Sequence, residues 1–413
     1  MSNCTTLCST RNLINQQCKC AIPHRDTLMS TKTRYRVAII GGGIVGMSVA
    51  YHLSNAGCQD VVVLEKNTIG SGTTSKSLGG FRHQYSTELN IRFSIESIRF
   101  LRDFEKVFGM DISIRNDGYL FLASNEQEMK ALENQAAVQK SLGVNVLILG
   151  PDAIKQMCPY LDMSGIIGGS FGPNDGHADT ATVLQGYSRA ALNNGITIRE
   201  NEEVTGFEYE EEGRSISSIA TTQGSILPEL VLICAGPYTG LISRFVGLDL
   251  PVYPYPRSIL VTNKFEGMPT HIPQIFDLES TLGVGQSGFA GIHLGLRNAQ
   301  PSNSSFEIKM DPDYAEKVVG EAVKRMPCVK NATLSHTISG LYEQTPDSNP
   351  LIGQLGQNLF VASGFSGHGF MHSPVAGRVV SELMLKGKTD YDISEFSPNR
   401  FAGEQSLGEK LAI

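Results

Sequence analysis

Three glycines early in the chain have the spacing of a turn that binds phosphate. Gly41, Gly43 and Gly46 follow the apolar run 35–40, and the apolar residues of 47–53 recur with helical spacing. In such a turn the first glycine permits a tight bend, the second lets backbone amides approach a pyrophosphate, and the third lets helix and strand pack closely. The N-terminus of the helix adds about half a positive charge. The pattern therefore predicts an anion site between a strand and a helix.

An acidic residue at the end of the next apolar run extends this prediction. The run 61–64 ends in Glu65, whose carboxylate would accept hydrogen bonds from an adenosine ribose. Strand, glycine turn, helix, strand and acid together predict dinucleotide binding, with an ordinary turn as the alternative. We assign the neighbouring Val45, Lys66 and Gly79 to the same site. The first turn alone does not separate a nicotinamide from a flavin dinucleotide.

Further glycine segments favour the flavin dinucleotide. The cluster 70–75 follows Glu65 closely and offers hydroxyl and amide donors to the same phosphates, although a solvated loop is the alternative. The apolar run 230–234 leads into a turn at 235–237, and a third glycine loop at 364–369 precedes a helix expected from about Ser373 to Lys386. An extended flavin dinucleotide requires contacts distributed in this way, and the third loop argues against a nicotinamide cofactor.

Composition sets the frame for these motifs. The chain has 413 residues, 41% apolar and 18% charged, which suits a globular protein of two or three domains. Its 34 basic and 41 acidic residues give a net charge of −7 without a basic cluster, which excludes nucleic acid as a partner. We expect neither a signal peptide nor a membrane span, because the sequence has no apolar segment of the required length.

Cysteine usage indicates a reducing compartment. Eight cysteines in 413 residues are too sparse for a disulfide scaffold, and we expect a cytoplasmic protein. The spacing of Cys4, Cys8, Cys18 and Cys20 matches no zinc or iron–sulfur pattern, so we predict no metal site. We expect residues 1–33 to form a disordered extension.

Periodicity predicts the other elements coarsely. We expect a strand within 111–123, helices at 126–141 and from about 179 to 194, a hairpin tip at 208–213, several strands in 250–335 interrupted by a helix at 313–325, and a strand at 358–362. No linker rich in Pro, Gly or Ser separates these segments, so the domains should be interleaved.

Four segments together resemble the FAD-dependent D-amino-acid oxidase superfamily. They are 41–65, 72–74, the segment from Gly340 to the TPDSNP motif at 345–350, and the GFSGHGF loop at 364–370. The likeness is strongest to the β subunits of sarcosine oxidase and L-proline dehydrogenase, and weaker to glycine oxidase and monomeric sarcosine oxidase. It covers about residues 34–401.

The resemblance implies an α/β fold in which a glutathione-reductase-like, FAD-binding Rossmann domain is interleaved with a β-rich substrate domain. Segments 34–100, 165–236 and 337–401 would form the FAD-binding domain, 101–164 and 237–336 the substrate domain, and 402–413 a tail. It further implies that the cofactor is held by Gly41, Gly43, Gly46, Glu65, Gly72, Thr73, Thr74, Val204, Ala235, Gly236, Gly367, His368, Gly369 and Phe370.

The chemistry implied is oxidation of the C–N bond of a small secondary or N-methylated amino acid of the sarcosine, proline or glycine type. Hydride would pass to flavin N5 and leave an imine. The electrons would continue to O2 or to an electron-accepting subunit or carrier. The heteromeric relatives add the possibility of a hetero-oligomer with FMN at a subunit interface.

Five residues are the candidates for catalysis. Arg82 lies where a relative presents an arginine to the substrate carboxylate, with a surface ion pair as the alternative. Tyr342 matches an aromatic residue near the substrate, and a core tyrosine is the alternative. His293 falls where a relative has a lysine that assists oxygen. His368, like His83, is a candidate base, although a structural histidine is the more common case.

Departures from the family pattern bear on cofactor attachment and electron acceptor. Gly340 stands where monomeric enzymes attach FAD through cysteine, and Ser75-Lys76-Ser77 replaces an attachment histidine, so we expect non-covalent FAD. An imidazole at 293 in place of an ammonium favours a dehydrogenase over an oxidase. A non-catalytic flavin-binding assembly protein and, less favoured, a nicotinamide-dependent dehydrogenase remain as alternatives.

Overall fold

The computed structural model describes residues 32–210, 215–286, 291–297, 303–309, 311, 313–402 and 409. The described residues from Arg34 onward form one compact unit. The four N-terminal cysteines and residues 211–213 of the expected hairpin tip at 208–213 lie outside the described residues. Every helix and strand in the described ranges belongs to the unit that begins at Arg34.

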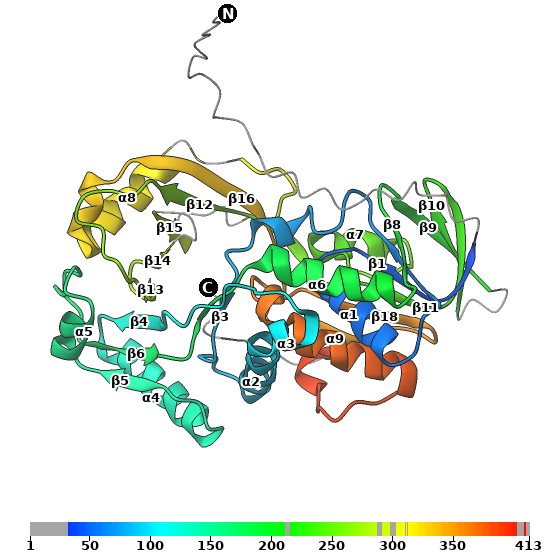
Figure 1. Cartoon of the computed structure of the whole chain (residues 1–413), viewed down its shortest axis with the longest axis horizontal. Coiled ribbons are helices and arrows are strands. Elements are labelled where there is room, and N and C mark those ends of the chain that lie inside the picture. Colours follow the sequence, from blue (N-terminus) through cyan, green and yellow to red (C-terminus); the bar gives the residue numbers. More distant parts are fainter. Residues whose placement is uncertain are drawn as a thin grey trace, which may run out of the picture. The chain divides into compact units, whose positions relative to one another are not determined.

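The first sheet is built mainly of parallel strands and carries the N-terminal glycine turn (Figure 1). Its order is β17-β18-β11-β1-β2-β8, and β10 joins β11 to β9 at one side. β1, β2, β8, β11 and β18 pair in parallel, whereas β17, β9 and β10 pair antiparallel. The strands are β1 (Arg34–Ile40), β2 (Val61–Leu64), β8 (Thr197–Arg199), β9 (Val204–Tyr209), β10 (Ile216–Thr221), β11 (Gly224–Ile233), β17 (Leu351–Gln354) and β18 (Leu359–Ser363).

The central strands are buried on both faces, as expected for a parallel sheet covered by helices. Every residue of β2 and β18 is buried, and four of them are the valines and leucine of 61–64. Figure 1 shows α1, α6 and α9 beside this sheet. The helices are α1 (Ile44–Asn55), α2 (Glu88–Arg102), α3 (Phe104–Phe108), α4 (Glu126–Ser141), α5 (Pro151–Met157), α6 (Thr180–Asn193), α7 (Thr239–Arg244), α8 (Tyr314–Arg325) and α9 (Gly369–Lys386).

The second sheet is mixed and has its own core. Its order is β16-β12-β15-β14-β13-β4-β6-β5, antiparallel except for the parallel pair β13 and β4. Leu260, Ile275 and Leu294 pack with α8 to form this core. The strands are β4 (Tyr119–Ala123), β5 (Leu147–Leu149), β6 (Gly168–Gly172), β12 (Tyr253–Thr262), β13 (Gln274–Asp277), β14 (Leu282–Gln286), β15 (Ile292–Leu296) and β16 (Leu334–Gln344).

Several short elements lie outside the two large sheets. β3 (Gly80–Phe81) pairs antiparallel with β7 (Gly176–His177) in a separate two-stranded sheet. The 3₁₀ turns are η1 (Thr73–Lys76), η2 (Gly236–Tyr238), η4 (Pro327–Asn331), η5 (Ser394–Phe396) and η6 (Arg400–Ala402). β16 contacts both η1 and η2, so the long edge strand of the second sheet reaches the turns of the first.

These observations confirm the predicted α/β fold class. β6 (Gly168–Gly172) and most of β16 (Leu334–Gln344) fall in segments that we assigned to the FAD-binding domain, whereas both strands belong to the second sheet. The predicted domain boundaries stay a prediction. One local prediction was wrong: α9 begins at Gly369 rather than near Ser373. The N–H of His372 donates to the carbonyl of His368 at 3.2 Å, which closes a helical turn ahead of Pro374.

Candidate functional site

One cavity of about 680 Å³ lies where the turns of the first sheet face the second sheet. This volume falls within the range of about 300–1,000 Å³ typical of small-molecule and cofactor sites. All the predicted site residues except Gly79 and His83 line it: Gly41, Gly43, Val45, Gly46, Glu65, Lys66, Gly72, Thr73, Thr74, Arg82, Val204, Ala235, Gly236, His293, Tyr342, Gly367, His368, Gly369 and Phe370. The structure thus brings together residues that lie more than 300 positions apart in the sequence.

The N-terminal glycine turn is packed too tightly for side chains at two positions. Gly41 has a φ of +112°, and a Cβ there would lie 2.2 Å from the Cys234 carbonyl oxygen. A Cβ at Gly46 would lie 2.1 Å from the carbonyl oxygen of Gly41. Glycine is therefore required, since no side chain fits between β1, β11 and the first turn of α1.

Glu65 is oriented by backbone donors. The N–H of Gly42 donates to its Oε2 at 2.9 Å, and the N–H of Asn67 donates to its Oε1 at 2.9 Å. Next to it, the Lys66 ammonium lies 3.3 Å from the centroid of the Tyr238 ring. Val204 lines the same cavity. This part of the cavity presents a fixed carboxylate next to a cation.

The 72–74 segment joins two elements of the cavity. Thr74 Oγ1 accepts a hydrogen bond from the N–H of Ile44 at 3.0 Å, at the start of α1. Thr73 Oγ1 donates to the carbonyl of Leu341 in β16 at 3.1 Å. Gly79 lies elsewhere: a Cβ there would lie 1.8 Å from the Ala178 carbonyl oxygen, so this glycine serves a close backbone contact.

Two helices begin at the cavity. Ile44 and Val45 form the first turn of α1, and Gly369 and Phe370 form the first turn of α9. Each helix N-terminus carries a partial positive charge and backbone N–H groups without intrahelical partners. The cavity therefore has two separate places that favour negative charge, one for phosphate and one near the third glycine loop.

Arg82 is a buried guanidinium, not a surface ion pair. The residue is 6% exposed, and Nη1 donates to the Gln84 carbonyl at 2.7 Å. The guanidinium carbon lies 4.1 Å from the centroid of the Tyr85 ring, and the Tyr85 hydroxyl donates to Met371 Sδ at 3.2 Å. These contacts hold Arg82 beside the start of α9.

Two buried histidines lie near Arg82. Burial, a neighbouring histidine and the Arg82 charge hold the pKa of His368 well below its usual range. Burial and Arg82 likewise lower the pKa of His372 to about 3. Nε2 of His368 makes no hydrogen bond within the described part of the chain, whereas Nε2 of His372 lies 3.0 Å from Ser94 Oγ. His368 is therefore a neutral imidazole that lines the cavity.

His83, the other candidate base, has a structural role. Its Nδ1 and its backbone N–H both lie within hydrogen-bond distance of Asp175 Oδ1, at 2.7 and 2.8 Å. Gln84 Nε2 donates to the second oxygen of Asp175 at 3.1 Å. His83 is not among the residues that line the cavity.

His293 faces the cavity from the second sheet. Its Nε2 lies 2.8 Å from Gln274 Oε1, an acceptor, so Nε2 carries the proton. Burial lowers its pKa to about 4, and His177 acts in the same direction. His293 is consequently uncharged near pH 7, unlike a lysine at the same place.

Sequence reasoning missed Glu343 and Arg257. Glu343 follows Tyr342 in β16 and lines the cavity, and burial raises its pKa. Arg257 in β12 lies opposite Gly340, with its guanidinium carbon 5.6 Å from the centroid of the Tyr342 ring. The signal available for Glu343 was a charged residue between Tyr342 and the TPDSNP motif.

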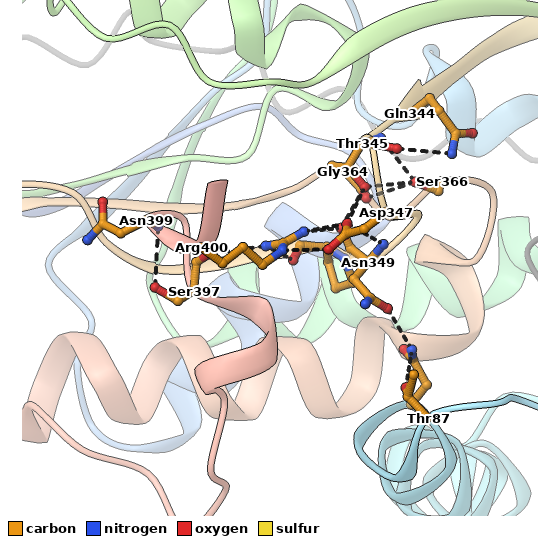
Figure 2. Close-up of polar contacts among 12 residues, drawn as sticks. Thr87, Gln344, Thr345, Asp347, Asn349, Gly364, Ser366, Ser397, Asn399 and Arg400 are labelled. Carbon is orange, nitrogen blue, oxygen red and sulfur yellow. Dashed lines mark hydrogen bonds and ion pairs between the residues drawn. The ribbon is translucent and has the colours of Figure 1, made fainter. Parts of the chain in front are cut away.

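A buried network holds the TPDSNP turn against the third glycine loop (Figure 2). Thr345 Oγ1 donates to the Asn349 carbonyl at 2.7 Å, and its backbone N–H donates to Ser366 Oγ at 3.2 Å. Arg400 forms two hydrogen bonds of 2.8 Å with the Asp347 carboxylate. The turn therefore fixes the loop that follows β18.

The cavity fits a flavin dinucleotide. It combines a ribose-type carboxylate, two helix N-termini and three glycine segments where backbone approaches the cavity closely. The second sheet contributes the polar side chains of Gln274, Gln286 and His293 to the lining. A nicotinamide dinucleotide gives no reason for the glycine loop before α9.

Comparisons with known proteins agree with this geometry. The model of the family described as FAD dependent oxidoreductase matches residues 36–383. FAD-dependent oxidoreductase domain-containing protein 1 of Xenopus laevis is 31% identical over 92% of this chain and 85% of its own length. Mitochondrial dimethylglycine dehydrogenase of Rattus norvegicus is 27% identical over 90% of this chain, which spans only 45% of that relative.

Among solved structures, L-proline dehydrogenase from P. horikoshii superposes with a TM-score of 0.83 at 30% identity, covering 89% of this chain and 98% of its own. No helix in the described ranges has the length and apolarity that crossing a membrane requires. The family match and this structural likeness confirm the resemblance found in the glycine loops and the TPDSNP motif. The chain belongs to the FAD dependent oxidoreductase family.

Proposed function

We propose that this chain oxidises the C–N bond of a small secondary or N-methylated amino acid. The observation that carries the proposal is the place of Arg82, a buried guanidinium that lines the same cavity as the 367–370 loop. A guanidinium fork matches a carboxylate with two parallel hydrogen bonds. The names of two relatives, dimethylglycine dehydrogenase and L-proline dehydrogenase, support an amino acid of this kind.

In this proposal Arg82 orients the substrate by binding the substrate carboxylate, and Tyr342 packs beside the substrate. Bound FAD would supply the hydride acceptor. Reaction requires the neutral amine. His368 is the candidate to receive the ammonium proton because it lines the cavity and its Nε2 makes no hydrogen bond within the described residues, but its lowered pKa makes it a weak base near pH 7. The chain's own task is to hold the reacting C–H in place. Such positioning lowers the activation free energy by up to about 7–11 kcal/mol when the geometry is right.

The neutral state of His293 supports a dehydrogenase. An uncharged imidazole offers O2 no permanent positive charge, so we propose that the electrons leave through another subunit or a carrier. Non-covalent attachment is proposed because position 340 carries no side chain that could bond to flavin. FMN at an interface, a hetero-oligomer and a cytoplasmic location stay predictions.

An anaerobic screen tests the substrate. Protein loaded with FAD is mixed with sarcosine, dimethylglycine, proline or glycine, and the visible flavin band is followed. We expect bleaching by at least one secondary or N-methylated amino acid, and no bleaching by its methyl ester, which lacks the carboxylate. Bleaching by the ester at the same rate would contradict the proposal. So would a flavin that dithionite reduces but that none of the amino acids bleaches.

A further inference from the structure

Glu343 is the acidic group of the cavity for which the proposed chemistry has no use. It lies in β16, directly after Tyr342, and lines the cavity. The other acidic residues that line the cavity belong to other segments of the chain: Glu65, Asp117, Glu202 and Glu203. Asp117 forms an ion pair with Arg115. Glu343 therefore calls for a separate explanation.

Hydrogen bonds tie Glu343 to two turns of the first sheet. Ser363 Oγ, at the end of β18, donates to Glu343 Oε2 at 2.8 Å. Thr239 Oγ1, which follows η2, donates to the same Ser363 hydroxyl at 2.8 Å. The N–H of Ser366 donates to the backbone carbonyl of Glu343 at 3.2 Å. One residue thus connects β16, the third glycine loop and the 236–239 turn.

The carboxylate lies between two glycines that were predicted to contact the cofactor. A Cβ at Gly236 would lie 3.5 Å from Glu343 Oε2, and a Cβ at Gly369 would lie 3.6 Å from Glu343 Oε1. Gly369 is also the first residue of α9. The negative group consequently sits at the helix N-terminus nearest the third glycine loop.

Burial and hydrogen bonding act in opposite directions on Glu343. Burial is the largest effect and raises its pKa from the ordinary value, whereas hydrogen bonds from Ser363 and from the N–H groups of Gly364 and Phe365 lower it. Each hydrogen bond to the ionised group contributes about 1.5–3 kcal/mol, so the donors offset part of the cost of burying the charge.

We propose that Glu343 is a positioning residue with an electrostatic role: it holds the 364–369 loop against the 236–239 turn, and its negative charge lowers the reduction potential of the bound flavin. Reduction adds negative charge to the flavin, and a fixed anion in a low-dielectric cavity opposes it. The inference rests on FAD binding, which the family supplies, and does not depend on which amine is the substrate.

Two variants separate charge from position. Glu343→Gln removes the charge and keeps the length, so we expect the equilibrium between oxidised and two-electron-reduced flavin to shift about tenfold towards reduction, a rise of about 30 mV. Glu343→Asp keeps the charge but shortens the reach to Ser363, so the potential should stay near wild type while the Kd for FAD rises about tenfold. Both are measured anaerobically with a chemical reductant and a reference dye, without any amine.

Asp277→Asn is the matched control. Asp277 is a buried carboxyl in β13 that bonds Arg325 and is not among the residues that line the cavity. Arg325 retains the carbonyls of Asp162 and Ser164 as acceptors. This variant should leave the flavin potential unchanged.

The outcomes are distinct. The proposal would be overturned if Glu343→Gln changes neither the equilibrium constant for flavin reduction nor the Kd for FAD by more than twofold from wild type. If that variant does not fold, Ser363→Ala takes its place: it removes the link between the loop and the 236–239 turn, and an unchanged Kd for FAD would overturn the positioning role. If the variants behave as expected while no amine bleaches the wild type, the substrate proposal alone fails.

Discussion

The Tyr342 ring lies directly against the backbone of Gly367. A Cβ at Gly367 would lie 2.5 Å from Tyr342 Cε2, and the glycine has a φ of +97°. This contact joins the edge strand of the second sheet to the third glycine loop of the first. The position of the ring in the cavity therefore depends on the absence of a side chain at 367.

Gly367→Ala should weaken FAD binding. The new methyl group meets the ring, and alanine disfavours a positive φ, so we expect a cost of about 1–3 kcal/mol from overpacking. FAD titration and thermal unfolding measure it. Gly320→Ala is the control, because Gly320 is exposed in α8 with nothing within 4 Å of a Cβ, and should stabilise the chain by up to about 1 kcal/mol. Equal effects of the two variants would argue against the contact.

Arg82→Lys should separate charge from geometry at the substrate site. Lysine keeps a cation but loses the fork, so at least one charge-assisted hydrogen bond of about 1.5–3 kcal/mol disappears, and kcat/KM should fall about 10- to 150-fold. Steady-state kinetics with the amine found in the screen measure this. Arg92→Lys, on the exposed face of α2, should change nothing. An Arg82→Lys enzyme with wild-type kcat/KM would remove Arg82 from the substrate site.

Acid should destabilise the fold through buried neutral histidines. The pKa of His293 is lowered to about 4 by burial, so as pH falls the unfolded chain binds a proton at an ordinary pKa of about 6.5 before the folded chain does. The free energy of unfolding therefore keeps its full value above about pH 6.5. Between pH 6.5 and pH 4 it falls as the pH falls, by up to about 1.4 kcal/mol per pH unit from His293. Urea titrations of His293→Gln should show a shallower loss. The exposed His336→Gln should keep the wild-type slope.

The Asp347–Arg400 pair should be strongly coupled. The two side chains are 5% and 6% exposed, and removing one partner leaves a buried charge, which costs about 3–5 kcal/mol. Asp347→Ala and Arg400→Ala should each show a large loss in chemical denaturation, and the double variant should lose less than the sum of the two. The exposed Glu88–Arg92 pair supplies the comparison, with an expected loss below about 1 kcal/mol. Additive losses at Asp347 and Arg400 would contradict the coupling.

Local signals in the sequence were sufficient for most elements. The helix expected at 126–141 is α4, since Asn125 accepts a hydrogen bond from the N–H of Glu128 and caps its start. The run 61–64 is β2. Apolar periodicity and caps act over a few residues, so they are legible without the fold. The strand expected within 111–123 is β4, which spans Tyr119–Ala123.

The long-range pairings could not be predicted. β4 pairs in parallel with β13, which joins Leu120 to Ile275, and no local pattern specifies that partner. The same holds for the site. Motif spacing predicted the glycines, but Glu343 accepts a hydrogen bond from Ser363 and lies beside Gly236, and both belong to other segments. Contacts of this kind depend on tertiary packing, and a sequence pattern of period two or 3.6 does not contain them.

Separate stretches of the chain should close around one non-covalent FAD. The most direct test is the flavin content of purified protein titrated with FAD, followed by denaturation and separation of protein from supernatant. We predict one FAD per chain, all of it released into the supernatant. A protein that takes up no FAD would contradict a cofactor in this cavity, and flavin that stays with the denatured chain would contradict non-covalent binding.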